Sequence, residues 1–573
     1  MKKTVFTLIS ALLITAGLKA QSVQEGVKHL MANRFKSASS TFEKLLAVNP
    51  NDAESAYWLG QAYLESEEIM GARLAAARKL YEKTLASSNH PLMLVGRGHI
   101  DLLENKPDAA RQAFESAITS TKGRKGNDPM ILYAVGRAIT DSKTGDFNYA
   151  VKLLKELTDI EKNNAMYWVM LGDAYRKAGQ GSGGGDAFKS YKKALDVNPT
   201  FARASYRLAQ LFESQRNGEF FLSYLQEAVQ KDPGFSAGYF ELFYYYFFRQ
   251  QYAEAEAQLQ KYIDSKGNKD IQDEYLYAQL CWARKDWDCA ITKANSVVAA
   301  LGDVTKPKVY RLLADASFEK ADFSNAKKYS DLFFVKKNPE DLGLYDFELR
   351  AKILDKTGGT DDEILNTYMQ AVTVDTPVTL KVDLMKKGVA YFKDNKKRDR
   401  EAMLMEKIIE IKPKPSTIND MFDLGVAYYF DSNYVKGRDA FLRIIDQFPD
   451  QVYGYEWAFN TSLAVDTVKK DSIAVPDALK LLAFAEKDTA KFRKQYISSV
   501  RFLAAYYINE AKDKNKSLEY FRKWKEIDVA NAEKIQEYIK QIESMPATAP
   551  RGRPAPKPET KTSSAAKKAP GKS

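Results

Sequence analysis

The chain has 573 residues, of which 45% are hydrophobic and 28% charged, and its formal net charge is +11. Residues 1–20 contribute +3 of this charge and residues 545–573 contribute +6, which leaves +2 for everything between them. The nearly neutral body mixes Lys with Glu and Asp, whereas a nucleic-acid-binding protein gathers its basic residues on one face. Charge therefore argues against a nucleic-acid partner.

Residues 1–20 have the layout of a secretory signal peptide. Lys2 and Lys3 precede an apolar run, and Ala20 stands directly before Gln21. Such a segment is recognised and removed during export, and its apolar run is too short to span a bilayer comfortably. No Cys stands directly after the expected cut, and no second long apolar segment exists in the sequence. We expect an exported chain that begins near Gln21, without a lipid anchor or transmembrane segment, in the periplasm or secreted.

A helix-hairpin pattern recurs about every 34 residues from near residue 23 to near residue 530, as the distance from Leu208 to Leu242 illustrates. Small residues in the pattern let two helices approach closely, and a proline stops the second helix. A fixed period of this length indicates a solenoid in which each unit buries its apolar face against its neighbours. The markers of the clearest unit are Trp168, Leu171, Gly172, Tyr175, Ala187, Tyr191, Ala194 and Pro199.

These markers resemble those of the tetratricopeptide repeat family, over roughly nine-tenths of the mature chain. The resemblance implies an all-α, right-handed superhelical solenoid of about fourteen antiparallel helix hairpins. We expect an N-terminal solenoid over residues 21–342 and a more degenerate one over residues 343–544. The degenerate hairpins, which have lost several markers, are those at residues 343–377, 380–415 and 452–490.

The C-terminal end of the pattern predicts a cap and a tail. Residues 530–544 read as a helix that is polar on one face, as the terminal cap of a solenoid should be. Residues 545–573 contain six prolines and many Ala and Lys. Such a segment cannot bury enough surface to offset its ordering entropy, so we expect a disordered tail. Its basic residues suit contact with cell wall or another acidic surface, and the alternative is a solvated linker.

The sequence contains few residues or motifs that indicate catalysis or cofactor binding. The three histidines, His29, His90 and His99, have no Cys, His or carboxylate cluster at metal-ligand spacing near them. A serine nucleophile elbow and a dinucleotide-binding fingerprint are also missing from the sequence. We therefore expect no enzymatic activity, no cofactor and no metal.

The two cysteines, Cys281 and Cys289, fall on the two helices of one hairpin, eight residues apart in the sequence. In an oxidising compartment they can form a disulfide that closes a small loop. The alternative is a pair of buried thiols on different helix faces, and the sequence does not decide between the two.

In proteins of the family that this chain resembles, the first helix of each hairpin lines a concave groove. The groove positions lie two residues before the Leu marker, two after it and five after it. From residue 206 to residue 318 these positions are dominated by aromatic side chains, which are typical of protein-binding hot spots. Self-packing of the aromatic residues is the alternative. The candidate groove residues are Tyr206, Gln210, Phe240, Tyr244, Phe247, Tyr275, Gln279, Trp282, Arg311 and Phe318.

The family's familiar grip on a chain-terminal carboxylate uses Lys and Asn at these positions, which here hold mainly aromatic residues and Gln. An extended apolar peptide or a partner helix fits this groove better. The sequence therefore predicts a non-enzymatic scaffold of the bacterial cell envelope that binds protein partners. A carbohydrate- or peptidoglycan-binding accessory protein is the alternative, because aromatic faces also stack on sugar rings. A lytic or regulatory enzyme is a third, which the missing catalytic residues disfavour.

Overall fold

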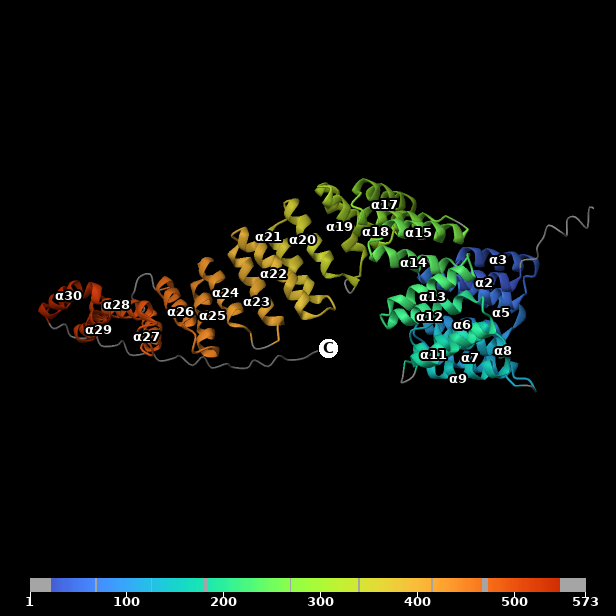
Figure 1. Ribbon diagram of the computed structural model, residues 1–573, viewed down its shortest axis with the longest axis horizontal. Helices are drawn as coiled ribbons and strands as arrows, with labels where there is room; N and C mark the ends of the chain where they lie inside the picture. Colours follow the sequence, from blue (N-terminus) through green and yellow to red (C-terminus); the bar gives the residue numbers. More distant parts are fainter. Residues whose placement is uncertain are drawn as a thin grey trace, which may run out of the picture. The chain divides into compact units, whose positions relative to one another are not determined.

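The structure is a computed structural model (Figure 1). It describes residues 22–66, 70–124, 126–179, 183–267, 269–338, 341–413, 416–465 and 473–546. The predicted signal peptide lies outside these residues, and so does the predicted tail from residue 547 onward. The chain divides into two compact units, Met1–Ala321 and Asp322–Ser573, which we call unit 1 and unit 2. The predicted change of repeat quality after residue 342 stays a prediction.

The described residues form α-helices that follow one another in packed antiparallel pairs, with three short 3-10 helices and no strand. Among the described residues, unit 1 contains eight hairpins, from α2 with α3 to α16 with α17, followed by α18. Unit 2 begins with α19 and contains five hairpins, from α20 with α21 to α28 with α29, before the single helix α30. The predicted all-α hairpin solenoid is confirmed. The predicted degenerate segments also form hairpins, and the last helix buries Ile535, Ile539 and Ile542 on one side.

The helices of unit 1 are α2 (Val23–Met31), α3 (Phe35–Val48), α4 (Ala53–Glu65), α5 (Met70–Ser88), α6 (Pro91–Leu103), α7 (Pro107–Thr121), α8 (Pro129–Thr140), α9 (Phe147–Ile160), α10 (Ala165–Ala178), α11 (Gly183–Val197), α12 (Ala202–Ser214), α13 (Gly218–Lys231), α14 (Ser236–Phe248), α15 (Tyr252–Lys266), α16 (Ile271–Ala283), α17 (Trp287–Leu301), η1 (Gly302–Val304) and α18 (Pro307–Glu319).

The helices of unit 2 are α19 (Phe323–Lys336), α20 (Leu344–Lys356), α21 (Asp361–Gln370), η3 (Ala371–Thr373), α22 (Val378–Asp394), α23 (Arg398–Ile411), α24 (Ile418–Phe430), α25 (Tyr434–Gln447), α26 (Val452–Val465), α27 (Ala474–Ala485), α28 (Arg493–Asn509), α29 (Lys514–Ile527), η4 (Val529–Asn531) and α30 (Ala532–Ser544).

The glycine marker of a hairpin makes room for the aromatic marker of its second helix. A Cβ atom placed on Gly172 of α10 would lie 2.4 Å from the ring of Tyr191 of α11, and one on Gly425 of α24 would lie 2.6 Å from Phe441 of α25. Both rings are fully buried. The recurring Gly and aromatic residues are therefore one packing contact, repeated along the chain.

Replacing Gly172 by Ala should lower the free energy of unfolding by about 1–3 kcal/mol, because the new methyl group overpacks the contact with Tyr191. Gly184 in the same hairpin is the matched control, since a Cβ there meets nothing within 4 Å. Its replacement by Ala should stabilise the helix by up to about 1 kcal/mol. Urea unfolding followed by circular dichroism measures both, and an equal effect of the two variants would contradict the packing account.

Unit 1 also closes on itself, so that its first hairpin contacts helices more than 170 residues further along the chain. Figure 1 shows α2 close to α14, and three hydrogen bonds join the end of α2 to α12 and α14. The carbonyl oxygen of Ala32 accepts from the Ala237 amide (3.3 Å) and from the Ser236 hydroxyl (2.5 Å), and that of Met31 accepts from Arg203 Nη1 (2.8 Å). Nothing in the marker pattern predicts this closure.

Candidate partner-binding face

The predicted groove residues lie on the first helices of four successive hairpins, α12, α14, α16 and α18, all in unit 1. Tyr206 and Tyr275 are buried, with 6% and 8% of their surface exposed, so they offer little area to a partner. Arg311 is exposed. The others are half-buried: Gln210, Phe240, Tyr244, Phe247, Gln279, Trp282 and Phe318.

A row of side-chain hydrogen bonds ties these first helices together. Each bond spans 33 to 35 residues of sequence and joins one first helix to the next. The row therefore fixes the orientation of the aromatic side chains relative to the neighbouring hairpin. The bonds run from Tyr206 Oη to Glu241 Oε1 (3.2 Å), from Tyr244 Oη to Gln279 Oε1 (3.2 Å) and from Trp282 Nε1 to Asp315 Oδ2 (3.1 Å).

Helix α14 carries a cluster of aromatic rings, Phe240, Tyr244, Phe247 and Phe248, which we call the aromatic ledge. Tyr244 is stacked on Phe248, with ring centroids 5.7 Å apart, and also contacts Phe240 and Phe247. Phe248 is 76% exposed. The ledge thus combines partly buried rings with one ring that is almost wholly open to solvent.

Phe248 is the member that the groove spacing missed, because it stands one position beyond the last predicted groove position of its helix. The signal that points to it is composition. The end of α14, from residue 243 to residue 248, consists of six consecutive aromatic residues. A helix has more than one face, so such a run places some rings outward whatever its register.

Burial shifts the pKa values of the polar groups on the helices that carry the candidate groove residues. Burial raises the pKa of Tyr244, although its hydrogen bond to Gln279 opposes the shift. Burial also raises the pKa values of Tyr206 and Tyr275, so both phenols stay protonated and remain donors. The pKa of Glu241 is raised by burial and then by Glu213. The face therefore offers aromatic rings and protonated phenols, together with the amides of Gln210 and Gln279 and the exposed Arg311.

A polar recess of about 570 Å³ lies among α8, α10 and α12 of the same unit. Arg207 Nη2 contacts Asp173 Oδ2 at 2.9 Å, and Asp173 also accepts a hydrogen bond from Tyr191. Arg207 and Asp173 therefore neutralise each other's charge in the wall of the recess. The lining residues are Thr140, Asp141, Asp173, Arg176, Lys177, Arg207, Gln210, Glu213 and Ser214.

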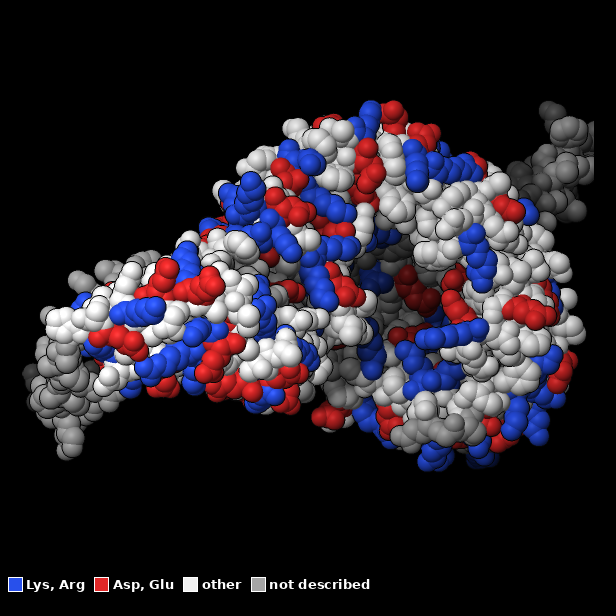
Figure 2. Space-filling model, turned by 60° about the vertical axis from the view of Figure 1, so that its left-hand side comes forward, with Lys and Arg blue, Asp and Glu red and all other residues white. Residues whose placement is uncertain are grey.

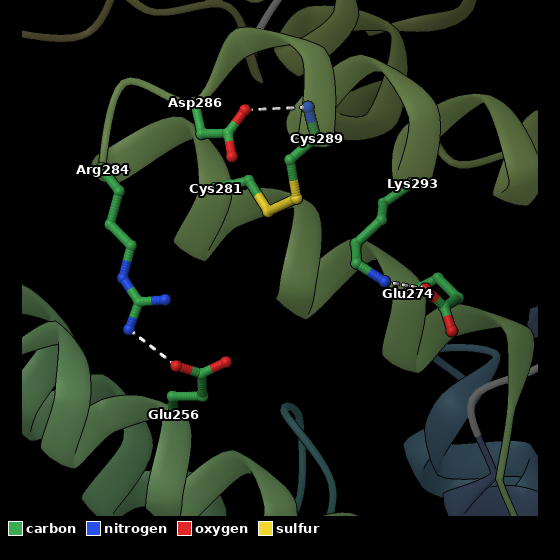
Figure 3. Close-up of a disulfide and its surroundings, with 7 residues drawn as sticks. All are labelled: Glu256, Glu274, Cys281, Arg284, Asp286, Cys289 and Lys293. Atoms are coloured by element: carbon green, nitrogen blue, oxygen red, sulfur yellow. Dashed lines mark hydrogen bonds and ion pairs between the residues drawn. A yellow bond between two sulfur atoms is a disulfide. The ribbon is translucent and has the colours of Figure 1, made fainter.

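Cys281 and Cys289 form a disulfide between the end of α16 and the start of α17, with Cα atoms 5.7 Å apart (Figure 3). Asp286 caps α17 by accepting from the Cys289 amide at 3.1 Å. Trp282 directly follows Cys281, so the crosslink lies next to one of the candidate groove residues. The structure thus places the two cysteines together, where the sequence left two arrangements open.

Charge on the surface is mixed. Figure 2 shows Lys and Arg interspersed with Asp and Glu over the face that it presents, with wide uncharged areas between them. Within the described part of the chain, no group of three or more His, Cys, Asp or Glu residues is arranged to hold a metal ion. No helix in that part is both long and apolar enough to cross a membrane.

Comparison with known proteins agrees with the hairpin markers. The family model of the tetratricopeptide repeat matches residues 24–88 and 184–234. Among curated proteins no match is found. The match to the family model confirms the resemblance predicted from the marker residues.

Solved structures of similar chains include several tetratricopeptide repeat proteins. The C-terminal part of one from Cytophaga hutchinsonii is 26% identical and covers 48% of this chain and 100% of its own, with a TM-score of 0.25. One from Parabacteroides merdae is 18% identical and covers 45% and 97%, with a TM-score of 0.36. Yeast Tom70 is 14% identical and covers 71% and 94%, with a TM-score of 0.34.

Proposed function

We propose that this chain, a tetratricopeptide repeat protein, is a non-enzymatic scaffold of the bacterial cell envelope that binds a partner peptide or helix on the aromatic ledge and the neighbouring first helices. Tetratricopeptide repeats support protein–protein interaction, because a solenoid presents long surfaces rather than enclosed reactive pockets. The single observation that carries the choice of site is the aromatic ledge, with Phe248 largely exposed above half-buried rings.

The chemistry of the ledge suits an apolar partner surface. Aromatic side chains that are rigid and partly buried lose little conformational freedom on binding, and they are enriched in binding hot spots. Gln279 on α16 accepts a hydrogen bond from Tyr244 and so adds a polar group beside the rings. An amphipathic helix or an extended apolar segment matches this combination, since each presents apolar side chains at regular spacing.

Location in the envelope follows from the predicted signal peptide at residues 1–20. Protein recovered from the envelope of the native cell should therefore begin at or near Gln21. An intact Met1 on that protein would contradict export, and the proposal would then be reduced to a scaffold without a location.

Replacing Tyr244, Phe247 or Trp282 by Ala should weaken partner capture by about 2 kcal/mol or more for each anchor, while the fold remains stable. Affinity capture from the envelope fraction with mass spectrometry identifies the partner, and titration with that partner measures the loss. Phe430 of unit 2, which is also well exposed, is the control for a general effect of removing a surface ring. Its replacement by Ala should leave capture unchanged.

Thermal unfolding measured on the same variants separates a binding site from a core. If the three rings serve only to pack the hairpins, each truncation should destabilise the fold by about 3–5 kcal/mol, and binding should fail through unfolding alone. Replacing the fully buried Phe243 by Ala shows what that outcome looks like on the same helix. Capture that is displaced by soluble peptidoglycan fragments would favour the carbohydrate alternative instead.

A further inference from the structure

The C-terminal end of α2 is capped by residues that lie far away in the sequence. The last carbonyl groups of a helix have no partner within it and carry a partial negative charge. Here Ala32 and Met31 direct their carbonyl oxygens at Ser236, Ala237 and Arg203. The guanidinium of Arg203 brings the positive charge that this helix end favours.

The same contact completes the N-terminal end of α14. Phe235, its N-cap residue, makes no side-chain hydrogen bond to the first turn. The amide of Ala237 in that turn donates to Ala32 of α2. The two helices therefore meet end to end, and each supplies the hydrogen-bonding group that the other lacks.

Ion pairs at the surface hold the rest of the first hairpin to the same side of unit 1. Lys36 of α3 pairs with Asp270, and Lys28 of α2 lies 3.7 Å from Asp232. The Lys36 side chain is 68% exposed. Exposed pairs of this kind are weak and are screened by salt. One further hydrogen bond, from the Ser37 hydroxyl to the Lys266 carbonyl, is long at 3.3 Å.

The apolar side of the hairpin packs in a different direction. Leu30, Met31 and Phe42 belong to a hydrophobic cluster whose buried members run on through α4, α6, α8 and α10. Apolar contacts thus attach the first hairpin to its neighbours in sequence, whereas polar contacts attach it to α12, α14 and α16. The centre of the second attachment, at Ala32 and Ser236, is buried, whereas its outer part consists of ion pairs whose lysines are exposed. That outer part contributes less than the buried apolar area of the first attachment.

We infer that α2 and α3 form a clasp that opens and closes unit 1: the hairpin stays folded and packed on α4 while its polar contacts with α12, α14 and α16 break and re-form. In the closed state the end of α2 caps α14. In the open state those helix ends are hydrated, and the inner surfaces of the early and late hairpins separate. This inference concerns the fold itself and does not depend on which partner binds the ledge.

The Ala237 amide reports on the clasp, because it is bonded to α2 and yet belongs to α14. In the full-length protein, residue-resolved hydrogen exchange should show this amide exchanging faster as NaCl rises from about 0.05 M to about 0.5 M, while the central amides of α3 stay protected. Replacing Ser236 by Ala should accelerate exchange at Ala237 by about 5- to 10-fold, the effect of losing one hydrogen bond.

Charge reversal at Lys36 tests the ion pair, and Lys44 is the matched control on the same helix. Lys36→Glu should accelerate exchange at Ala237 by about 3-fold or more, because it faces Asp270 with a like charge. Lys44→Glu, at an exposed position of α3, should have no effect. Acceleration at Ala237 only together with the central amides of α3 would show local unfolding rather than a clasp. Exchange at Ala237 that changes neither with salt nor with Ser236→Ala or Lys36→Glu would show a permanently fixed contact. Either result would overturn the inference.

Discussion

Replacing Arg137 by Met should lower the free energy of unfolding of unit 1 by about 3–5 kcal/mol at neutral pH. The Arg137 side chain on α8 is 2% exposed, and its guanidinium pairs with Glu65 and, at 3.2 Å, with Asp141. Methionine fills much of the same volume but leaves the half-buried Glu65 and the more exposed Asp141 without their buried cation. Hydrogen exchange of the α8 amides, or urea unfolding, measures the loss.

The pH dependence of that loss identifies its cause. Burial raises the pKa of Glu65 even in the presence of Arg137, so without the arginine this carboxyl should protonate more readily still. The deficit of the variant should therefore shrink as the pH falls. Arg111, which is exposed and pairs with Glu115, is the control, and its replacement by Met should cost no more than about 1 kcal/mol. A deficit at Arg137 that is equally small would mean that its pairs contribute little.

Lowering the pH from 7 to 4 should cost unit 1 up to about 3 kcal/mol through His99 alone, given about 1.4 kcal/mol for each pH unit by which a pKa is shifted. Burial lowers the pKa of His99 to about 4, and Asp141 only partly opposes the shift. The folded state thus binds its proton at lower pH than the unfolded state does. The stabilising effect is complete above the unfolded pKa of 6.5 and is lost as the pH falls from there toward 4.

Replacing His99 by Gln should flatten the stability curve over that window, because the titrating group is removed while a hydrogen-bonding side chain remains opposite Gln61. The exposed His90 is the control, and its replacement by Gln should leave the curve unchanged. Urea unfolding at a series of pH values gives the curves. The same slope in the His99 variant as in the parent chain would assign the acid sensitivity to other groups.

The sequence predicted the hairpins well, because the contacts that define them are local. Gly172 and Tyr191 are only nineteen positions apart, and their contact recurs with the period of the repeat. The closure of unit 1 has no such signal. Its partners, such as Ala32 and Ser236, are about two hundred residues apart, and whether they meet depends on small rotations accumulated over many hairpins.

The groove spacing in the sequence selected some residues that are accessible in the structure and some that are buried. The groove spacing found Tyr244 and Phe247, which are half-buried, but it also selected Tyr206 and Tyr275, which the neighbouring hairpins bury. Spacing along one helix does not reveal how closely the next hairpin approaches. The arrangement of Cys281 and Cys289 was open for a similar reason, because the pairing depends on how two opposed helices are rotated.

The row of hydrogen bonds from α12 to α18 has a mechanical consequence. Each bond resists sliding between two adjacent hairpins, so this stretch should bend and twist less than hairpins that meet through apolar contacts alone. The aromatic ledge rests on this stiffened stretch, held by Tyr244 and its bond to Gln279. A rigid receptor surface surrenders little conformational entropy when a ligand arrives, so more of the contact energy remains as affinity.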